Sequence, residues 1–500
     1  MNTGRAGTGH GPAVRDVHQR ARRAIRLLVG RQAVTQLIGL AGGIVVARIL
    51  GPTPLGVFGV ALFLVNLAGL VAELGIRTAL IRQPEAPDER QLATAFTLQL
   101  ALATMLAVLL FLAAPAIARL YGRELSGLPW LVRLLALDLY LRAWRSMSEV
   151  RLERELRYRE LAISDILGST GYHAVAVGLV LAGWGAGGLV AATLAGGVLR
   201  NASLHHAAPW RVRFGFQPAA ARALVRTGTA LQAGRVVGLA PGWITPTLVA
   251  GLIGAEAVGL LTWAATIGRK PFELLENVIR VAQPHFARLQ HDADEVEHTL
   301  ARYVLLSLLL CGLWFAVLLV AGRDLVILVF TEQWLPALPA LLVYAASAAL
   351  AAVRWLGAAA LVGIGRIRFT LNVSIVASVV AIAASVLLVV RHGAMGVPIG
   401  QLAGIAVATP WLLHGIRPGT ASRTLRASLP VFAPICAGIC AGALAGLAPL
   451  PPVLRGLFTA GIAASAYLAA AWSAGPRWLR ASVREDLALA TAHLGGPGAR

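Results

Sequence analysis

The sequence predicts an all-α polytopic membrane protein with 14 transmembrane helices, built as two six-helix lobes in parallel repeat plus two extra C-terminal helices. Three observations predict this fold class: the composition, the length of the apolar runs and an internal repeat. The chain has 500 residues, a mean hydropathy of +0.72 and only 13% charged residues. Soluble domains carry about 25% charged residues. This deficit, with many apolar runs near the roughly 20 residues that cross a bilayer, indicates repeated membrane crossings.

The internal repeat has an offset of 203 residues. The two copies begin Val46-Ala47-x3-Gly51-x4-Gly56 and Val249-Ala250-x3-Gly254-x4-Gly259. When residues 46–79 are aligned with residues 249–282, nine of 34 positions are identical, including a Glu and an Arg four residues apart. A repeat of this length inside apolar sequence predicts two copies of one membrane lobe.

Apolar periodicity and helix breakers divide the chain into candidate spans in order. Charged residues interrupt the fourth span, a Gly-rich turn at 183–188 separates the fifth from the sixth, and 322–336 is a short outer loop. Polar insertions around 149–160 and 205–226 are expected to be amphipathic segments on the cytoplasmic membrane surface. The predicted spans are 31–50, 56–82, 91–118, 130–147, 162–182, 187–204, 228–250, 258–283, 301–321, 337–360, 370–390, 395–414, 428–447 and 454–474.

The spans group into a predicted domain organisation. A basic arm at 1–30 precedes an N-lobe at 31–210 with spans one to six. A C-lobe at 211–420 holds spans seven to twelve, followed by spans thirteen and fourteen at 421–475 and a tail at 476–500. Because the first and seventh spans match and have the same orientation, the lobes should be related by an axis along the membrane normal.

Loop charges set the predicted orientation. An even number of spans places both termini on one side, and most loop arginines lie on the side of the N-terminal arm, which itself carries six arginines. By the positive-inside rule both termini are therefore predicted to be cytoplasmic. The opposite face has few arginines, chiefly Arg119, Arg123, Arg323 and Arg391.

Several functional classes are disfavoured by the residues themselves. The net charge of +21 is better explained by the positive-inside rule than by nucleic-acid binding, given the apolar runs. The three cysteines lie in apolar runs without metal-ligand spacing, so neither a metal site nor a cofactor is predicted. The G-x-G-x-x-G pattern at 183–188 lies between two apolar spans rather than between a strand and a helix, which disfavours dinucleotide binding.

Helix breakers occur at corresponding places in the first and seventh spans, where Gly39 and Gly242 are again 203 residues apart. Interrupted helices in matching positions of two halves indicate the binding region and hinges of a carrier, with tolerated kinks as the alternative. The sequence therefore predicts hinge residues in both spans. They are Gly39, Gly42, Gly43, Pro241, Gly242 and Pro246.

The eighth span holds the densest intramembrane charge cluster. Arg269, Glu273, Glu276 and Arg280 are spaced by four, three and four residues and would share one helix face, with Lys270 beside them. Each cation costs roughly 2.5–3.5 kcal/mol at the bilayer centre, whereas an i,i+4 pair returns only about 0.2–0.5 kcal/mol. This imbalance predicts that Arg269, Lys270 and Glu273 line a water-filled cavity and bind an anionic substrate such as a diphosphate. A structural charge network between helices is the alternative.

Other intramembrane charges are secondary candidates for substrate binding, with a structural or snorkelling role as the alternative. Arg142 is four residues from Asp138, and this pair would lie on one face of the fourth span. The remaining candidates are Arg48, Arg235 and Arg354.

Four segments resemble polysaccharide-type flippases of the multidrug/oligosaccharidyl-lipid/polysaccharide (MOP) superfamily, and in particular the branch that contains colanic-acid exporters. The resemblance covers about residues 25–420. The segments that carry it are Val46-Ala47-Arg48-Ile49-Leu50-Gly51-Pro52-Thr53-Pro54-Leu55-Gly56 with Glu73-Leu74-Gly75-Ile76, Arg154-Glu155-Leu156-Arg157-Tyr158-Arg159, Gly183-Trp184-Gly185 with Leu189, and Pro284-His285-Phe286-Ala287-Arg288-Leu289-Gln290. The Arg269-Lys270 pair departs from the apolar segment that such proteins have there.

The resemblance implies a transporter rather than an enzyme, located in the bacterial cytoplasmic (inner) membrane. The implied activity is translocation of an undecaprenyl-diphosphate-linked oligosaccharide by alternating access, for cell-surface or exopolysaccharide synthesis. The expected partners are a polyprenyl-diphosphate-linked glycan, membrane lipid, and a polysaccharide polymerase with its copolymerase. Alternatives are a cation-coupled drug or metabolite antiporter of the same superfamily, a polysaccharide polymerase, for which the outer loops are too short, and a non-transporting envelope scaffold.

Overall fold

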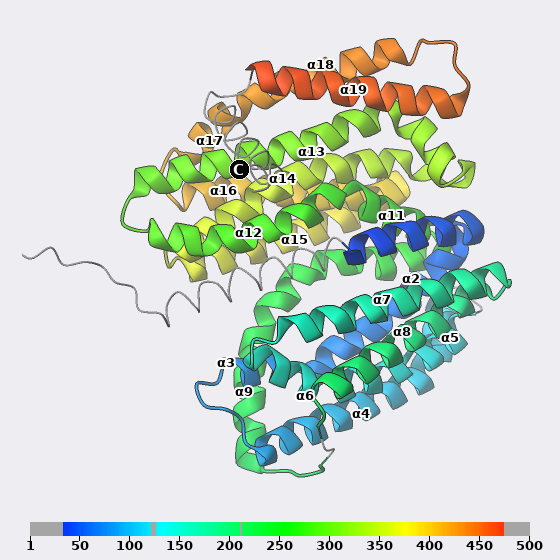
Figure 1. Ribbon diagram of the computed structural model, residues 1–500, viewed down its shortest axis with the longest axis vertical. Coiled ribbons are helices and arrows are strands. Elements are labelled where there is room, and N and C mark those ends of the chain that lie inside the picture. Colours follow the sequence, from blue (N-terminus) through cyan, green and yellow to red (C-terminus); the bar gives the residue numbers. More distant parts are fainter. Residues whose placement is uncertain (1–33, 122–126, 211–212, 475–500) are drawn as a thin grey trace, which may run out of the picture. The chain divides into compact units, whose positions relative to one another are not determined.

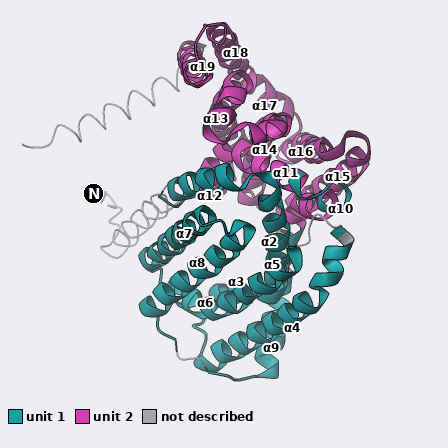
Figure 2. Cartoon of the chain, turned by 90° about the vertical axis from the view of Figure 1, so that its right-hand side faces the viewer, with its two compact units in different colours: residues 1–236, 250–256 teal, residues 237–249, 257–500 magenta. Residues whose placement is uncertain are grey.

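The computed structural model describes residues 34–121, 127–210 and 213–474, and the regular elements of these residues are all helices (Figure 1). The all-α prediction is therefore confirmed, and each predicted span falls on one or more of these helices. The chain divides into two compact units (Figure 2). Unit 1 comprises residues 1–236 and 250–256, and unit 2 comprises residues 237–249 and 257–500.

Unit 1 begins, in its described part, with a helix over Val34–Leu50. It continues with α2 (Pro52–Glu73), α3 (Ile76–Arg82), α4 (Glu89–Tyr121), α5 (Leu128–Leu135), α6 (Leu137–Arg154), α7 (Tyr158–Leu181), α8 (Gly185–Ala207), most of α9 (Pro218–Leu239) and the short α10 (Ala250–Leu252). The fourth predicted span is divided into α5 and α6 at Ala136.

Unit 2 includes the helical turns at Ala240–Trp243 and Thr245–Val249 and most of α11 (Ala255–Gly268). It continues with α12 (Lys270–Arg288), α13 (Ala293–Val329), α14 (Leu338–Gly363), α15 (Ile367–His392), α16 (Gly396–His414), α17 (Thr420–Ser428), α18 (Phe432–Ala445) and α19 (Pro452–Ala474). The long α13 starts at a well-formed cap, since the Asp292 side chain accepts hydrogen bonds from the backbone amides of Asp294 and Glu295.

Seven helical segments of the described chain are long and apolar enough to cross a membrane, and the 48-residue segment Ile367–His414 contains both α15 and α16. Shorter apolar helices lie at Val34–Leu50, Val236–Leu252 and Ala255–Gly268. Helix α6 is not among these segments because charged side chains recur along it. The chain is therefore a multi-pass membrane protein in which some helices are too polar to be recognised by hydropathy alone.

Two glycines, Gly75 and Gly228, allow α9 to approach the turn after α2 closely in unit 1. Helix α2 ends where Leu74 and Gly75 both adopt left-handed backbone conformations, with φ of +67° at Gly75. A Cβ atom on Gly75 would lie 2.3 Å from the carbonyl oxygen of Gly228, and one on Gly228 would lie 2.3 Å from that of Leu74. Nearby on α9, the Gln232 amide donates to the Leu70 carbonyl at 2.6 Å, which satisfies an acceptor at the end of α2.

The seventh predicted span is broken as the sequence indicates. Helix α9 ends at Leu239, a 3₁₀ turn covers Ala240–Trp243, and a π-helical turn covers Thr245–Val249. Pro241 has no N–H to donate to the Val237 carbonyl, which would be its partner in a regular helix. The Ser378 hydroxyl on α15 donates to that carbonyl instead, at 2.8 Å. Side chains from neighbouring helices thus satisfy backbone groups that the proline leaves open.

The expected interruption of the first span is wrong, because Val34–Leu50 is a continuous α-helix. One of its glycines, Gly42, permits close packing against α7. A Cβ atom on Gly42 would lie 2.5 Å from the His173 ring on α7, and one on Gly39 would lie 3.6 Å from it. Gly43 has open space where its Cβ atom would be. Breaks at corresponding places of the two spans are therefore not a shared feature of the described helices.

Candidate functional site

A stripe of charged residues follows one face of α6. Asp138, Arg142, Arg145, Glu149 and Glu153 are spaced by four, three, four and four residues, so their side chains lie on the same side of the helix. Asp138 and Glu149 are each only 4% exposed although both are acidic. Buried carboxylates require compensation by cations or hydrogen-bond donors, which neighbouring helices of unit 1 provide.

The Glu149 carboxylate is the centre of this arrangement. It forms ion pairs with Arg145 at 3.6 Å, with Arg200 of α8 at 3.0 Å, and with Arg77 of α3. Arg77 also lies 3.7 Å from Glu153, and Arg200 lies 2.8 Å from Asp165 of α7. Four helices therefore contribute to one network of alternating charges. The Nε atoms of Arg77 and Arg200 are buried and have no hydrogen-bond partner, so the network retains donor capacity.

Arg142 forms a second pair of contacts on the same face of α6. Its Nε donates to Asp138 at 2.6 Å, and its Nη2 donates to the Asn66 amide oxygen on α2 at 2.6 Å. The predicted i,i+4 pair is therefore present. Gly69 on α2 gives the guanidinium room, because a Cβ atom there would lie 3.0 Å from Nη1 of Arg142.

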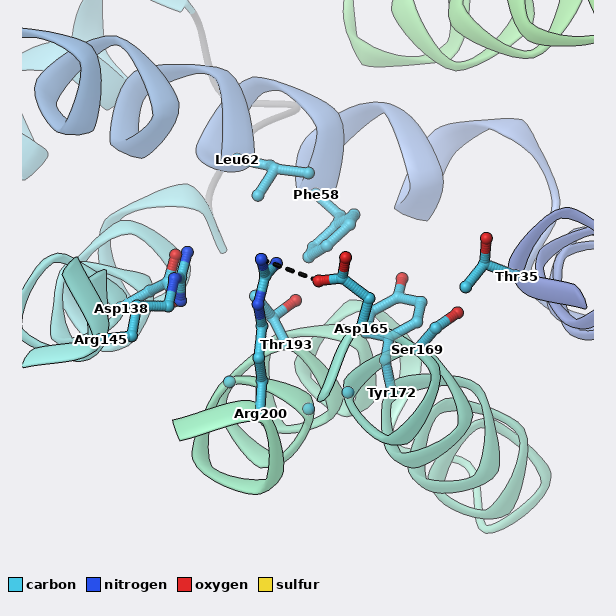
Figure 3. A pocket seen from close by; sticks show the side chains of 13 residues that line it. Thr35, Phe58, Leu62, Asp138, Arg145, Asp165, Ser169, Tyr172, Thr193 and Arg200 are labelled. Atoms are coloured by element: carbon cyan, nitrogen blue, oxygen red, sulfur yellow. Dashed lines mark ion pairs between the residues drawn. The ribbon is translucent and has the colours of Figure 1, made fainter. Parts of the chain in front are cut away.

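Two cavities adjoin this charged face in unit 1, and Figure 3 shows the larger of them. The larger has a volume of about 560 Å³ and lies among the first described helix, α2, α6, α7 and α8. Its polar lining comprises Thr35, Asp138, Arg145, Asp165, Ser169, Tyr172, Thr193 and Arg200. The smaller, of about 270 Å³, is lined by polar residues Asn66, Glu73, Arg77, Gln99, Arg142, Arg145, Ser146 and Glu149.

The two cavities differ in charge and chemistry. The larger has two carboxylates and two guanidiniums, together with hydroxyl groups and the aromatic rings of Phe58 and Tyr172. The smaller has three guanidiniums against two carboxylates, which leaves one formal positive charge. Arg145 lines both. Guanidinium groups bind phosphate oxygens in a bidentate manner, so the smaller cavity is chemically suited to a phosphorylated group.

The predicted cluster of the eighth span lies in unit 2 and has a different geometry. Helix α11 ends at Gly268 and α12 begins at Lys270, so Arg269 occupies the junction between them. Lys270 pairs with Glu273 at 2.7 Å, whereas Arg269 donates to the Gln401 amide oxygen at 2.6 Å and stacks on the Tyr344 ring at 4.7 Å. The described contacts of Arg269 are therefore with α14 and α16 and not with the acidic residues of the predicted face. Neither of the two cavities is lined by these cations.

The other predicted residues are dispersed. Arg354 lies over the Trp355 ring at 5.1 Å, with its Nε buried and without a hydrogen-bond partner. Arg48 is exposed on the first described helix. The side chains of Arg235 and Arg280 lie outside the described part of the structure. Among the predicted substrate-binding residues, only Arg142 lines one of the two cavities.

The expectation for residues 149–160 needs correction. This segment was expected to be an amphipathic surface insertion, but α6 continues to Arg154 and Glu149 is almost fully buried. The physical reason is that arginines from α3, α6 and α8 compensate its charge. Sequence reasoning missed Arg145, Glu149, Asp165 and Arg200 as site residues. The spacing of charges along α6 was the available signal, since it follows the same helical rule that singled out the eighth span.

Comparison with known proteins assigns the family. The chain matches the polysaccharide biosynthesis protein family over residues 45–339, which is more than half of its length. The chain belongs to this family. It is 25% identical over 303 residues to the succinoglycan biosynthesis transport protein ExoT of Rhizobium meliloti, and 29% identical over 288 residues to the teichuronic acid biosynthesis protein TuaB of Bacillus subtilis. These matches cover 59% and 56% of the chain, and 60% and 58% of the two relatives.

Solved structures show the fold. The lipid II flippase MurJ in an inward closed conformation superposes with a TM-score of 0.75 at 14% identity, covering 89% of this chain and 98% of the flippase. An inward-facing multidrug resistance MATE family transporter of the MOP superfamily gives a TM-score of 0.61 at 18% identity, covering 81% and 99%. The predicted fold of the MOP superfamily is therefore confirmed. One of the two relatives is named as a transport protein, and both solved structures are those of transporters.

Proposed function

We propose that the protein translocates a lipid-linked oligosaccharide, carried on undecaprenyl diphosphate, across the bacterial cytoplasmic membrane. In this proposal the fourteen predicted spans form two six-helix lobes that alternate access, with two further helices beside them. Support comes from the family match, from relatives named for succinoglycan transport and teichuronic acid biosynthesis, and from the fold shared with a lipid II flippase.

The observation that carries the proposal is the smaller cavity of unit 1. A lipid diphosphate is an anion with several acceptor oxygens, and Arg77, Arg142 and Arg145 present their guanidiniums around this cavity. The adjoining larger cavity has the carboxylates, hydroxyls and aromatic rings that bind sugar hydroxyls and faces. We assign the diphosphate to the smaller cavity and the adjacent sugar to the larger cavity. Arg269 and Lys270 remain proposed head-group ligands in unit 2.

Cells that lack the gene provide the test. In a deletion strain complemented with the Arg142→Gln variant, lipid-linked oligosaccharide should accumulate in the inner leaflet while surface glycan decreases. Loss of a charge-assisted hydrogen bond worth about 1.5–3 kcal/mol predicts an export rate lower by roughly 10- to 100-fold. Arg423→Gln is the matched control, because Arg423 is half exposed, pairs with Glu297 in unit 2 and lines neither cavity.

The double variant Arg269→Leu/Lys270→Leu tests the unit 2 cations in the same assay. Full export by both this variant and Arg142→Gln, at normal protein abundance, would exclude a head-group role for either set of cations. If the deletion strain itself accumulates no lipid-linked oligosaccharide in the inner leaflet, the protein is not the flippase and a polymerase-associated or scaffold role is favoured. The complemented strain can be used to identify a polymerase and copolymerase that copurify with the protein.

One observation favours a second candidate, a cation-coupled drug or metabolite antiporter. Asp138 and Asp165 line the larger cavity, and the fold resembles that of multidrug MATE transporters. An antiporter would confer drug resistance when overproduced, and its activity would require Asp165. Unchanged drug sensitivity, together with a glycan export defect in the deletion strain, would exclude this alternative.

A further inference from the structure

Two helix breaks of unit 2 are joined by one glutamine side chain. Gln401 lies on α16 and is 7% exposed. Its Nε2 donates to the Pro241 carbonyl, in the break of the seventh span, at 3.2 Å. Its Oε1 accepts from Nη2 of Arg269, at the junction of α11 and α12, at 2.6 Å. The two ends of a single amide thus connect two places where the backbone departs from a regular helix.

Arg269 is held by neutral groups. None of the ion pairs among the described residues includes it, and its partners are the Gln401 amide and the Tyr344 ring. Gly268 permits this proximity, because a Cβ atom there would lie 2.8 Å from Cβ of Tyr344. The Gln401 side chain therefore links Arg269 to the broken segment.

We propose that Gln401 is a positioning residue that couples Arg269 to the break of the seventh span, so that an anion binding Arg269 alters the bend at residues 237–249. The amide can satisfy both partners only in one orientation, with its oxygen toward Arg269 and its nitrogen toward Pro241. A phosphate oxygen forms a stronger, charge-assisted bond with a guanidinium than an amide oxygen does. When an anion draws Arg269 away, Gln401 loses the contact that fixes its orientation, and the Pro241 carbonyl loses its donor. The anionic ligand in this inference rests on the proposed function, whereas the coupling does not.

Amide hydrogen exchange of the purified full-length protein in lipid nanodiscs tests the coupling. Gln401→Leu removes both side-chain hydrogen bonds of Gln401. Gln401→Glu keeps an acceptor for Arg269 but loses the donor to the Pro241 carbonyl. Arg269→Met removes the guanidinium and leaves the bond between Gln401 and Pro241 in place. We expect all three to raise the exchange rate of peptides covering residues 237–249 by about tenfold, a change typical of local opening. The double variant Arg269→Met/Gln401→Leu should not exceed Gln401→Leu, because both changes break the same relay.

Asn201→Leu is the matched control, since Asn201 is a buried amide of unit 1 that lines neither cavity and should leave this segment unchanged. If Arg269→Met leaves exchange at 237–249 unchanged while Gln401→Leu raises it, Gln401 only caps the break and the relay does not exist. Inorganic pyrophosphate is the probe for the ligand, and it should raise exchange at 237–249 in the wild-type protein but not in Arg269→Met. No response of the wild-type protein would overturn the anion trigger, even if glycan export confirmed the flippase.

Discussion

At the residue scale, the burial of Glu149 depends on three guanidinium groups that approach it from α3, α6 and α8. Each of these cations would be costly at membrane depth if it had no counter-ion. The carboxylate in turn would be a buried charge without compensation at 5% side-chain exposure if they were absent. In the proposed function, a lipid diphosphate would share or replace the ion pairs that Glu149 forms with these arginines, so Glu149 would affect both stability and substrate binding.

Removal of this carboxylate should therefore destabilise the protein. We expect Glu149→Ala to lower the free energy of unfolding by about 3–5 kcal/mol, since deleting one partner of a buried ion pair leaves uncompensated charge. Thermal unfolding of the detergent-purified protein measures the change. Glu155→Ala is the control, because Glu155 is 55% exposed and pairs with Arg157 in a loop, where pairs contribute about 0–1 kcal/mol. Equal stability losses in the two variants would show that Glu149 is not the centre of the network.

At the element scale, a proline break is stable only if another group satisfies the carbonyl that it leaves open. Ser378 of α15 does this for the Val237 carbonyl. We expect Ser378→Ala to cost about 1–3 kcal/mol, the price of a buried acceptor without a donor. Pro241→Ala should recover much of this loss in the Ser378→Ala background, because the new backbone N–H at position 241 can donate to the Val237 carbonyl. Ser374→Ala is the control on the same helix, since its hydroxyl bonds only the Thr370 carbonyl of α15. A double-mutant cycle of unfolding free energies gives the coupling, and strict additivity would contradict this account.

Close backbone approach determines another element, the contact of α9 with the turn between α2 and α3. A Cβ atom on Gly228 would lie 2.3 Å from the Leu74 carbonyl, so Gly228→Ala should force the helix away and destabilise unit 1 by about 1–3 kcal/mol. Gly238 is a matched control at the end of the same helix, because its Cβ atom would meet open space. Gly238→Ala should be neutral or stabilise by up to about 1 kcal/mol through helix propensity. Melting temperatures that fall equally in both variants would mean that propensity, not contact, decides the effect.

The sequence was informative about elements and less so about the site. Hydropathy and the recurring Gly51/Gly254 motif predict where helices lie, and the missing N–H of Pro241 predicts the break in the seventh span. The same reasoning misplaced Glu149, because burial of a charge is decided by partners from helices far along the chain. It also over-interpreted Gly42, whose contact with His173 is a matter of packing that no local pattern specifies.

At the scale of the whole molecule, some positions that are 203 residues apart have charged side chains in unit 1 and apolar side chains in unit 2. At the offset of 203 residues, Arg145 and Glu149 correspond to Ala348 and Ala352. Those alanines belong to an apolar cluster with Leu275 and Cys311. The site where unit 1 has its charge network is therefore filled in unit 2 by small apolar side chains.

A guanidinium nevertheless persists at one matched interhelical contact. In unit 1, Arg142 of α6 reaches Asn66 of α2 at 2.6 Å. In unit 2, the position that matches Asn66 is Arg269, which reaches toward α14 and stacks on Tyr344, the neighbour of the position that matches Arg142. The cation is supplied by opposite helices in the two units, and the helix pair that it joins is the same.

This exchange of partners makes a final prediction. Arg142→Ala should abolish the contact and leave Asp138 without its ion pair, which lowers both stability and glycan export. Asn66→Arg in the Arg142→Ala background moves the guanidinium to the helix that carries it in unit 2, where it can again face Asp138 and the smaller cavity. We expect the double variant to regain at least about 1 kcal/mol of stability and roughly fivefold in export over Arg142→Ala, since one restored charge pair is worth that much in a partly buried site. Asn66→Gln with Arg142→Ala is the neutral control and should regain neither. If Asn66→Arg regains no more than Asn66→Gln in the Arg142→Ala background, a guanidinium on α2 cannot replace the one on α6. The position of the cation would then be essential, and the exchange of helices inferred from unit 2 would be contradicted.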